Sequence, residues 1–349
     1  MTDLAEPPIR LTDLTDCGGC AAKLGADVLA EALAGLGAGD TERGLVAGLD
    51  PADDAAAYLV APDLAVLGTL DFFPPVVDDP RTYGEIAAAN ALSDVFAMGG
   101  RVLFALSIAA FPEDFSRDAL RAVLEGAQSK VREAGGVLAG GHTIRDPEPK
   151  YGLAVVGAGH PNRLFRKGGA LPDDVLLLTK RLGTGCLVSG RRLGRAAEPA
   201  FEAAVEQMRT LNRPAAEVLA THGIRGATDV TGFGLLGHGL EMARASGTRF
   251  AFSAASLPAL DGALDLARAG IETGGAGHNR RFTAPALSVG DDVPRELVAL
   301  AHDPQTSGGL LAAVPAGTVA AVEAALAAAG VTSWRVGVVE DGAPAVSLH

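Results

Sequence analysis

Cysteine is scarce in this sequence. Only Cys17, Cys20 and Cys186 occur among its 349 residues. A small and odd number of cysteines argues against the disulfide framework of a secreted protein. A reducing cytoplasm is therefore the expected environment.

Long apolar runs and basic clusters are also missing. No apolar run reaches the roughly 18 residues that indicate a spanning helix, and the polar stretch 1–10 contains two prolines, so we expect neither a membrane anchor nor a signal peptide. Lys and Arg number 29 against 42 acidic residues, which gives a formal net charge of -13. Without a basic face the chain has no electrostatic grip on nucleic acid or anionic lipid, and a small molecule is the expected partner.

The sequence also lacks a Walker A loop, because no Gly-x-x-x-x-Gly-Lys-Ser/Thr is present. An ordinary P-loop enzyme is thereby excluded. An acidic protein can still bind a polyanion such as ATP if Mg²⁺ held by carboxylates bridges the two.

The length and the 48% apolar content predict two domains with a sizeable core. We expect a flexible glycine-rich segment with a first helix at 27–36 within 1–45, a mixed α/β domain at 46–165 and an α+β domain at 166–349. Apolar patterns predict strands and helices in both domains. The strands are expected at 64–70, 102–109, 151–156, 175–179, 249–252, 310–314 and 334–339, and the helices at 83–98, 117–134, 318–329 and, as one long element, 198–222.

Four aspartates stand at positions where binding residues occur. Asp53 and Asp54 open an expected strand, where adjacent side chains point opposite ways, so one of the two faces a site; a solvated turn is the alternative. Asp71 follows a strongly apolar run. Asn90 and Asp94 are four apart on a nearly apolar helix and share one face, which indicates a metal or nucleotide role or hydrogen bonds to a neighbouring loop.

Three glycine-bearing segments permit close backbone approach to a ligand. The segment 140–143 contains His142, which is either a ligand-binding or a turn residue. The segment 228–238 opens a helix and offers Asp229 as a cation ligand. The segment 303–309 is either a third ligand loop or a tight turn.

Cys20 and Lys23 lie beside two glycines, where an amine could stabilise a thiolate or a phosphate. The Cys17-x-x-Cys20 spacing also permits a redox pair or half of a zinc site, although Cys186 alone does not complete a zinc cluster.

Taken together and in this order, the motifs resemble those of the selenophosphate synthetase family across nearly the whole chain. They are C-x-x-K (20–23), DDAA (53–56), TLDFF (69–73), NALSDVFAMGG (90–100), GGHT (140–143), TDVTGFG (228–234) and DPQTSGG (303–309). Many relatives have a second cysteine immediately before the lysine, where this chain has Ala22.

The resemblance implies a two-domain fold like that of aminoimidazole ribonucleotide synthetase, with an N-terminal mixed-sheet domain that forms a homodimer and binds ATP and Mg²⁺. It implies the reaction of ATP, selenide and water to selenophosphate, AMP and orthophosphate, which supplies activated selenium for selenocysteine and selenouridine synthesis. Free selenide and a protein-bound selenium donor both remain open as the selenium source.

The resemblance also implies roles for individual residues. Asp54, Asp94 and Asp229 would hold Mg²⁺, and Cys20 with Lys23 would carry the chemistry on a mobile lid. The positions implied around ATP are Lys23, Asp53, Asp71, Asp94, Gly141, His142 and Thr143.

Two other functions compete with this hypothesis. One is a nucleotide-dependent enzyme of purine, thiamine or hydrogenase-maturation chemistry, against which the Cys20-x-x-Lys23 pairing argues. The other is a non-catalytic selenium or sulfur carrier, which would not need the aspartates.

Overall fold

The computed structural model describes residues 10–15, 18–23, 32–33, 36, 44–49 and 52–349. Cys17 and most of the helix expected at 27–36 lie outside these residues. The backbone of Cys20 belongs to the short 3-10 helix η2 (Gly19–Ala22), and another such turn, η1 (Leu11–Leu14), precedes it.

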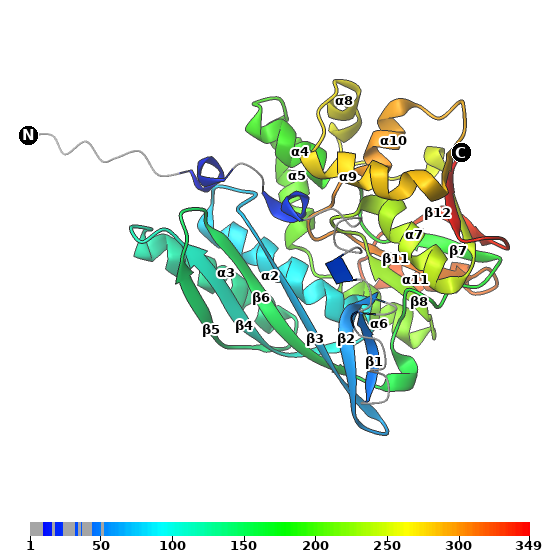
Figure 1. Ribbon diagram of the computed structural model, residues 1–349, viewed down its shortest axis with the longest axis horizontal. Coiled ribbons are helices and arrows are strands. Elements are labelled where there is room, and N and C mark those ends of the chain that lie inside the picture. Colours follow the sequence, from blue (N-terminus) through cyan, green and yellow to red (C-terminus); the bar gives the residue numbers. More distant parts are fainter. Residues whose placement is uncertain (1–9, 16–17, 24–31, 34–35, 37–43, 50–51) are drawn as a thin grey trace, which may run out of the picture.

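A six-stranded sheet forms the N-terminal half, in the order β1-β2-β3-β6-β4-β5 (Figure 1). Its neighbours run antiparallel, apart from the parallel pair β4 and β5. The strands are β1 (Leu45–Leu49), β2 (Ala52–Ala61), β3 (Leu64–Phe73), β4 (Arg101–Phe111), β5 (Val137–Arg145) and β6 (Lys150–Gly159). The strands predicted at 64–70, 102–109 and 151–156 are confirmed.

Two helices, α2 (Pro80–Ala97) and α3 (Arg117–Glu133), cover one face of this sheet, behind the strands in the view of Figure 1. Asp79 begins α2 by accepting a hydrogen bond from the Thr82 amide, and Pro80 occupies the first turn, where no donor is lost. The two helix backbones almost touch, since a Cβ added at Gly84 would lie 2.0 Å from the Val123 carbonyl oxygen. Small residues therefore set the close packing of this layer.

A seven-stranded sheet forms the C-terminal half, in the order β10-β13-β9-β12-β7-β11-β8. Its strands are β7 (Asp174–Leu178), β8 (Gly226–Asp229), β9 (Arg249–Phe252), β10 (Leu287–Val289), β11 (Leu310–Pro315), β12 (Trp334–Glu340) and β13 (Ala345–Leu348). The helices around it are α4 (Thr184–Arg192), α5 (Glu198–Arg209), α6 (Arg213–Thr221), α7 (Gly234–Ser246), α8 (Ala263–Arg268), α9 (Gly274–Thr283), α10 (Arg295–His302) and α11 (Val319–Ala328).

The prediction of one long helix over 198–222 is wrong. The chain leaves the helix at Thr210, which has an extended conformation, and a second helix begins at Arg213. Pro214 explains the break, because proline fits the first turn of a helix but not its interior. The apolar period continues through both helices, and that periodicity hid the break.

One hydrophobic cluster contains residues of both halves, and a second is formed by the C-terminal half alone. Alternate residues of β7 point to opposite sides of the second sheet: Leu177 packs with the N-terminal half, whereas Leu176 and Leu178 pack with the outer helices. Any site between the halves is therefore held by a continuous packed interior. None of the helices among the described residues has the length and apolar character needed to cross a membrane.

The register of the first sheet distinguishes its two faces. Asp71 of β3 pairs with Leu153, Leu153 with Ser107, and Ser107 with Gly141 of β5, so these four residues form one row. They point to the side of α2 and α3, which we call the covered face. Along each strand, the residues directly before and after a member of this row point to the opposite side of the sheet, which we call the open face. Large apolar side chains of the open face are exposed: Tyr58, Leu70, Phe72, Leu106 and Ile144.

Candidate functional site

The side chain of Asp71 joins the cysteine segment, residues 18–23, to the first sheet. Lys23 Nζ donates to Asp71 Oδ2 over 2.9 Å, and Asn90 of α2 donates its amide to the same oxygen. Asp71 is only 8% exposed although its strand lies at the junction of the two halves. It lies inside β3 rather than just past it, because the strand continues to Phe73.

Asn90 also connects this group to loop 303–309. Its Oδ1 accepts a hydrogen bond of 2.8 Å from the Ser307 amide. The same loop is held by Asn212, which donates to the Gly308 carbonyl at 2.7 Å, and by buried Lys180, which donates to the Ser307 carbonyl at 2.7 Å. The loop is thus packed against α2, and Asn90 makes the hydrogen bond to a neighbouring loop that the sequence allowed.

Asp94 lies one turn beyond Asn90 and accepts a hydrogen bond from Thr69 of β3. Burial, followed by the nearby Asp229 and Asp71 carboxylates, raises the pKa of Asp94 well above its usual range. Three aspartates from β3, α2 and β8 are therefore close enough to repel one another. Such crowding is unfavourable without a cation.

Asp54 brings the start of β2 to the same place. Its Oδ1 accepts from Thr228 Oγ1 at 2.8 Å and lies 3.3 Å from Lys167 Nζ. Burial raises the pKa of Asp54 to about 8, with further increases from Asp229 and Asp53, although Lys167 opposes them. Asp53 takes a different partner, Arg166, at 3.7 Å.

Two buried carboxylate oxygens in this cluster, Asp54 Oδ2 and Asp229 Oδ2, have no hydrogen-bond partner among the described residues. An unpartnered buried carboxylate oxygen is costly, and hard oxygen ligands are those that Mg²⁺ prefers. In the part of the chain that the structure describes, no three acidic, histidine or cysteine side chains form a closed metal-binding group. The donor set therefore fits a divalent cation that also takes ligands from a bound phosphate.

The cysteine segment lies against this cluster. The Gly19 amide donates to the Pro74 carbonyl over 3.1 Å, and a Cβ at Gly19 would lie 2.4 Å from Thr306 Oγ1. Gly19 has a φ of +66°, so glycine satisfies both the conformation and the close approach. The backbone of Cys20 is thereby placed beside loop 303–309, while its side chain is outside the described part of the structure.

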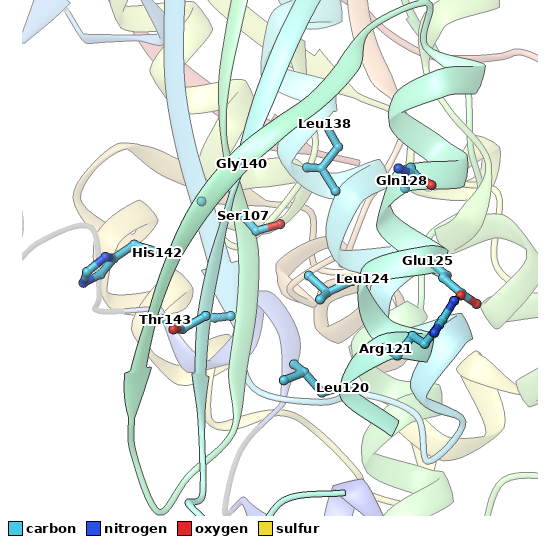
Figure 2. A pocket seen from close by; sticks show the side chains of 12 residues that line it. Ser107, Leu120, Arg121, Leu124, Glu125, Gln128, Leu138, Gly140, His142 and Thr143 are labelled. Atoms are coloured by element: carbon cyan, nitrogen blue, oxygen red, sulfur yellow. The ribbon is translucent and has the colours of Figure 1, made fainter. Parts of the chain in front are cut away.

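The segment 140–143 is not brought to the aspartates within one chain. It forms the middle of β5, three strands from β3, which corresponds to about 14 Å. A cavity of about 510 Å³ separates β5 from α3, and Figure 2 shows His142 pointing away from it, on the open face. Gly141 and Thr143 line the cavity on the covered face.

Sequence reasoning missed two buried lysines at the site. Lys167 lies in the stretch 161–174, whose proline, glycine and charge pointed to a boundary, and Lys180 follows a core strand. Neither belongs to a motif with a known spacing. The one feature that could have indicated a buried lysine was its position next to a core strand. Exposed lysines often occupy such positions too, so the feature does not distinguish them.

Comparisons with known proteins agree with this architecture. Residues 52–158 match the model for the N-terminal domain of AIR synthase related proteins, and residues 172–348 match the C-terminal one. A selenide, water dikinase of Myxococcus xanthus is 45% identical over 97% of both chains. One from Agathobacter rectalis is 46% identical over 92% of this chain and 93% of its own.

Solved structures with a similar fold are more distant in sequence. A Thermus thermophilus protein is 24% identical over 93% of this chain and 97% of its own, with a TM-score of 0.67. A thiamine monophosphate kinase of Aquifex aeolicus is 17% identical over 92% of this chain and 94% of its own, with a TM-score of 0.62. These two show the fold alone. The 45% and 46% identity to the two selenide, water dikinases extends over nearly the full length and shows the family. The chain belongs to the selenide, water dikinase family, one of the AIR synthase related proteins.

Proposed function

We propose that the aspartates between the two halves hold the phosphates of ATP through Mg²⁺, and that the cysteine segment brings selenium to them. The activity itself follows from the family: the chain is an enzyme, a selenophosphate synthetase that uses ATP and selenide. The reaction forms selenophosphate, AMP and orthophosphate. The observation that carries the proposal is the convergence of four aspartates beside the segment that bears Cys20.

Asp54, Asp94 and Asp229 are the proposed Mg²⁺ ligands. They come from β2, α2 and β8, and two of their buried oxygens lack partners. The cation would neutralise phosphate charge that otherwise opposes attack by an anionic nucleophile. Loss of Asp229 would bring the pKa of Asp54 and that of Asp94 closer to their usual range, because its carboxylate raises both.

Lys23, Asp71 and Asp53 are the proposed contacts to the nucleotide. Lys23 binds Asp71 in this structure, and the same ammonium group can exchange that carboxylate for a phosphate oxygen when ATP enters. Lys23 lies three residues after Cys20, so binding of Lys23 to a phosphate would bring the Cys20 thiol close to the phosphates. Cys20 would then accept, hold or deliver selenium as a thiolate.

A homodimer would explain the position of residues 141–143. Five large apolar side chains are exposed on the open face, a pattern typical of an interface. His142 lies on the same face, so a second copy packed there could present its own β5 to the nucleotide. We therefore propose that the ATP site is completed by Gly141, His142 and Thr143 of the partner subunit.

The test is a phosphorus NMR time course with ATP, Mg²⁺ and selenide under anaerobic, reducing conditions. Selenide-dependent formation of selenophosphate with AMP and orthophosphate is the expected result. Cys20→Ser should abolish the selenium product and leave ATP binding intact, and Cys186→Ser, at a buried cysteine of α4, is the control for loss of a thiol. Unchanged selenophosphate output from Cys20→Ser would remove Cys20 from the mechanism.

A further inference from the structure

A buried chain of charged groups lies behind Asp54. Lys167 Nζ is 3.3 Å from Asp54 Oδ1 and 3.1 Å from Glu241 Oε2 of α7. The side chains of Asp54 and Lys167 are only 4% and 9% exposed. The lysine therefore joins a carboxylate of the first sheet to a carboxylate of the second half with little access to solvent.

Glu241 is itself held in place. His238, one turn earlier on α7, places its Nδ1 3.1 Å from Glu241 Oε2, and its Nε2 lies 3.2 Å from Thr231 Oγ1. Burial would lower the pKa of Lys167, but the Glu241 and Asp54 carboxylates outweigh it and raise the pKa. Thr231, His238, Glu241 and Lys167 thus form a row in which each polar group lies within 3.2 Å of the next.

The two oxygens of Asp54 have different surroundings. Oδ1 accepts the Thr228 hydroxyl and faces Lys167, whereas Oδ2 is buried and has no partner in the part of the chain that the structure describes. A carboxylate held by two donors on one oxygen has a fixed orientation, and its second oxygen points in one direction. Supporting groups of this kind commonly orient metal ligands.

We propose that Lys167 is a positioning residue that holds Asp54 Oδ1, so that Oδ2 alone is directed to the cation, and that Glu241 and His238 of α7 set the position of the lysine. This inference rests on the proposed role of Asp54 as a Mg²⁺ ligand. It makes the cation site of the first sheet dependent on a helix of the C-terminal half, because removal of Lys167 would let the Asp54 carboxylate turn.

A simpler role would be that Lys167 only neutralises Glu241. The two roles are separable, because removing one partner of a buried ion pair is strongly destabilising, whereas removing both charges is often tolerated. Lys167→Met leaves Glu241 uncompensated. The double variant Lys167→Met/Glu241→Gln removes both charges and keeps an amide oxygen for His238.

The experiment measures the Mg²⁺ dependence of binding of a non-hydrolysable ATP analogue by calorimetry, with the melting temperature as a check of folding. Both Lys167→Met and the double variant should require about 10 to 100 times more Mg²⁺, the usual cost of losing a group that orients a metal ligand. The double variant should also regain most of the stability lost in the single one. Lys150→Met, which removes a lysine ion-paired with Asp146 and Glu148 rather than with a proposed Mg²⁺ ligand, should bind as the parent does.

A double variant with the parent's Mg²⁺ dependence would overturn the inference, since Lys167 would then only neutralise Glu241. Asp54→Asn separates this failure from that of the proposed function. If Asp54→Asn needs far more Mg²⁺ while Lys167→Met does not, only the inference fails. If Asp54→Asn binds as the parent does, Asp54 is not a ligand and both fail.

Discussion

The two faces of the six-stranded sheet carry different kinds of side chain although the same strands supply both. On the covered face, β3 presents Thr69 and Asp71, which make hydrogen bonds to Asp94, Asn90 and Lys23. On the open face the same strand presents Leu70 and Phe72, which are 56% and 44% exposed. Alternation along one strand therefore separates polar groups from an apolar surface.

The two faces differ because polar side chains on a buried face need hydrogen-bond partners, whereas apolar side chains on an exposed face do not. Polar groups on the covered face are buried, so each must find a partner, as Asp71 does with Lys23 and Asn90. Those partners fix the geometry that a cation and phosphates require. The open face needs no such partners, and its apolar side chains are available for a second copy of the chain.

The largest effect is expected from a change on the covered face. Asp94→Asn removes one charge that the cation needs and should weaken binding of ATP in the presence of Mg²⁺ by about 100-fold or more. Calorimetric titration measures the change, and Asp341→Asn in an exposed turn is the matched control. A normal Mg²⁺ dependence in Asp94→Asn would contradict the assignment of the covered face to chemistry.

A smaller effect is expected from a change on the open face. Phe72→Glu places a charge in the proposed interface of both copies and should raise the dimer dissociation constant by about 100-fold, or about 2.7 kcal/mol. Sedimentation velocity at several concentrations measures it. Leu171→Glu, at a side chain that is 66% exposed outside the sheet, should leave the oligomeric state unchanged.

The same variant links assembly to binding. If residues 141–143 of a partner complete the ATP site, Phe72→Glu should lose nucleotide affinity in proportion to its dissociation and regain it at high protein concentration. A monomeric parent with full affinity would mean that the open face serves neither assembly nor the site.

Much of this architecture could be predicted from the sequence because it depends on local patterns. Apolar runs placed β3 and β4, and four-residue spacing placed Asn90 and Asp94 on one face of α2. The motifs that resemble the family predicted that the aspartates belong to one site. The structure places Asp54 and Asp94 close to Asp229, and Asp94 close to Asp71. Local patterns, however, contain no information on which distant groups become partners.

The parts that could not be predicted depend on such distant contacts. Lys167 gains its importance only because α7 brings Glu241 to it, 74 residues along the chain. Strand order, which the sequence does not reveal, places His142 three strands from Asp71. The break between α5 and α6 was missed for a different reason, because the local signal was present. The prediction followed the continuous apolar period and gave too little weight to Pro214.

A further effect expected on the covered face is a pH dependence of stability. The pKa of Asp54 is about 8 in the folded chain, and that of an unfolded aspartate is about 3.9. Below about 3.9 both states hold the proton. As the pH rises from there towards 8, the unfolded chain ionises first, so stability contributed by the protonated carboxyl is lost by at most about 1.4 kcal/mol per pH unit.

Asp54→Asn cannot lose that proton, so the metal-free variant should melt above the parent by a margin that grows between pH 5 and pH 8, at roughly 2–4 °C for each kcal/mol. Subtracting the two melting curves removes the titration of all groups that the proteins share. If Asp54 is a Mg²⁺ ligand as proposed, Mg²⁺ with ATP should favour the ionised carboxylate and reverse the order of the two proteins at pH 8. If the difference in melting temperature does not change with pH, Asp54 is already ionised without the cation. The covered face would then not raise the pKa of this carboxyl.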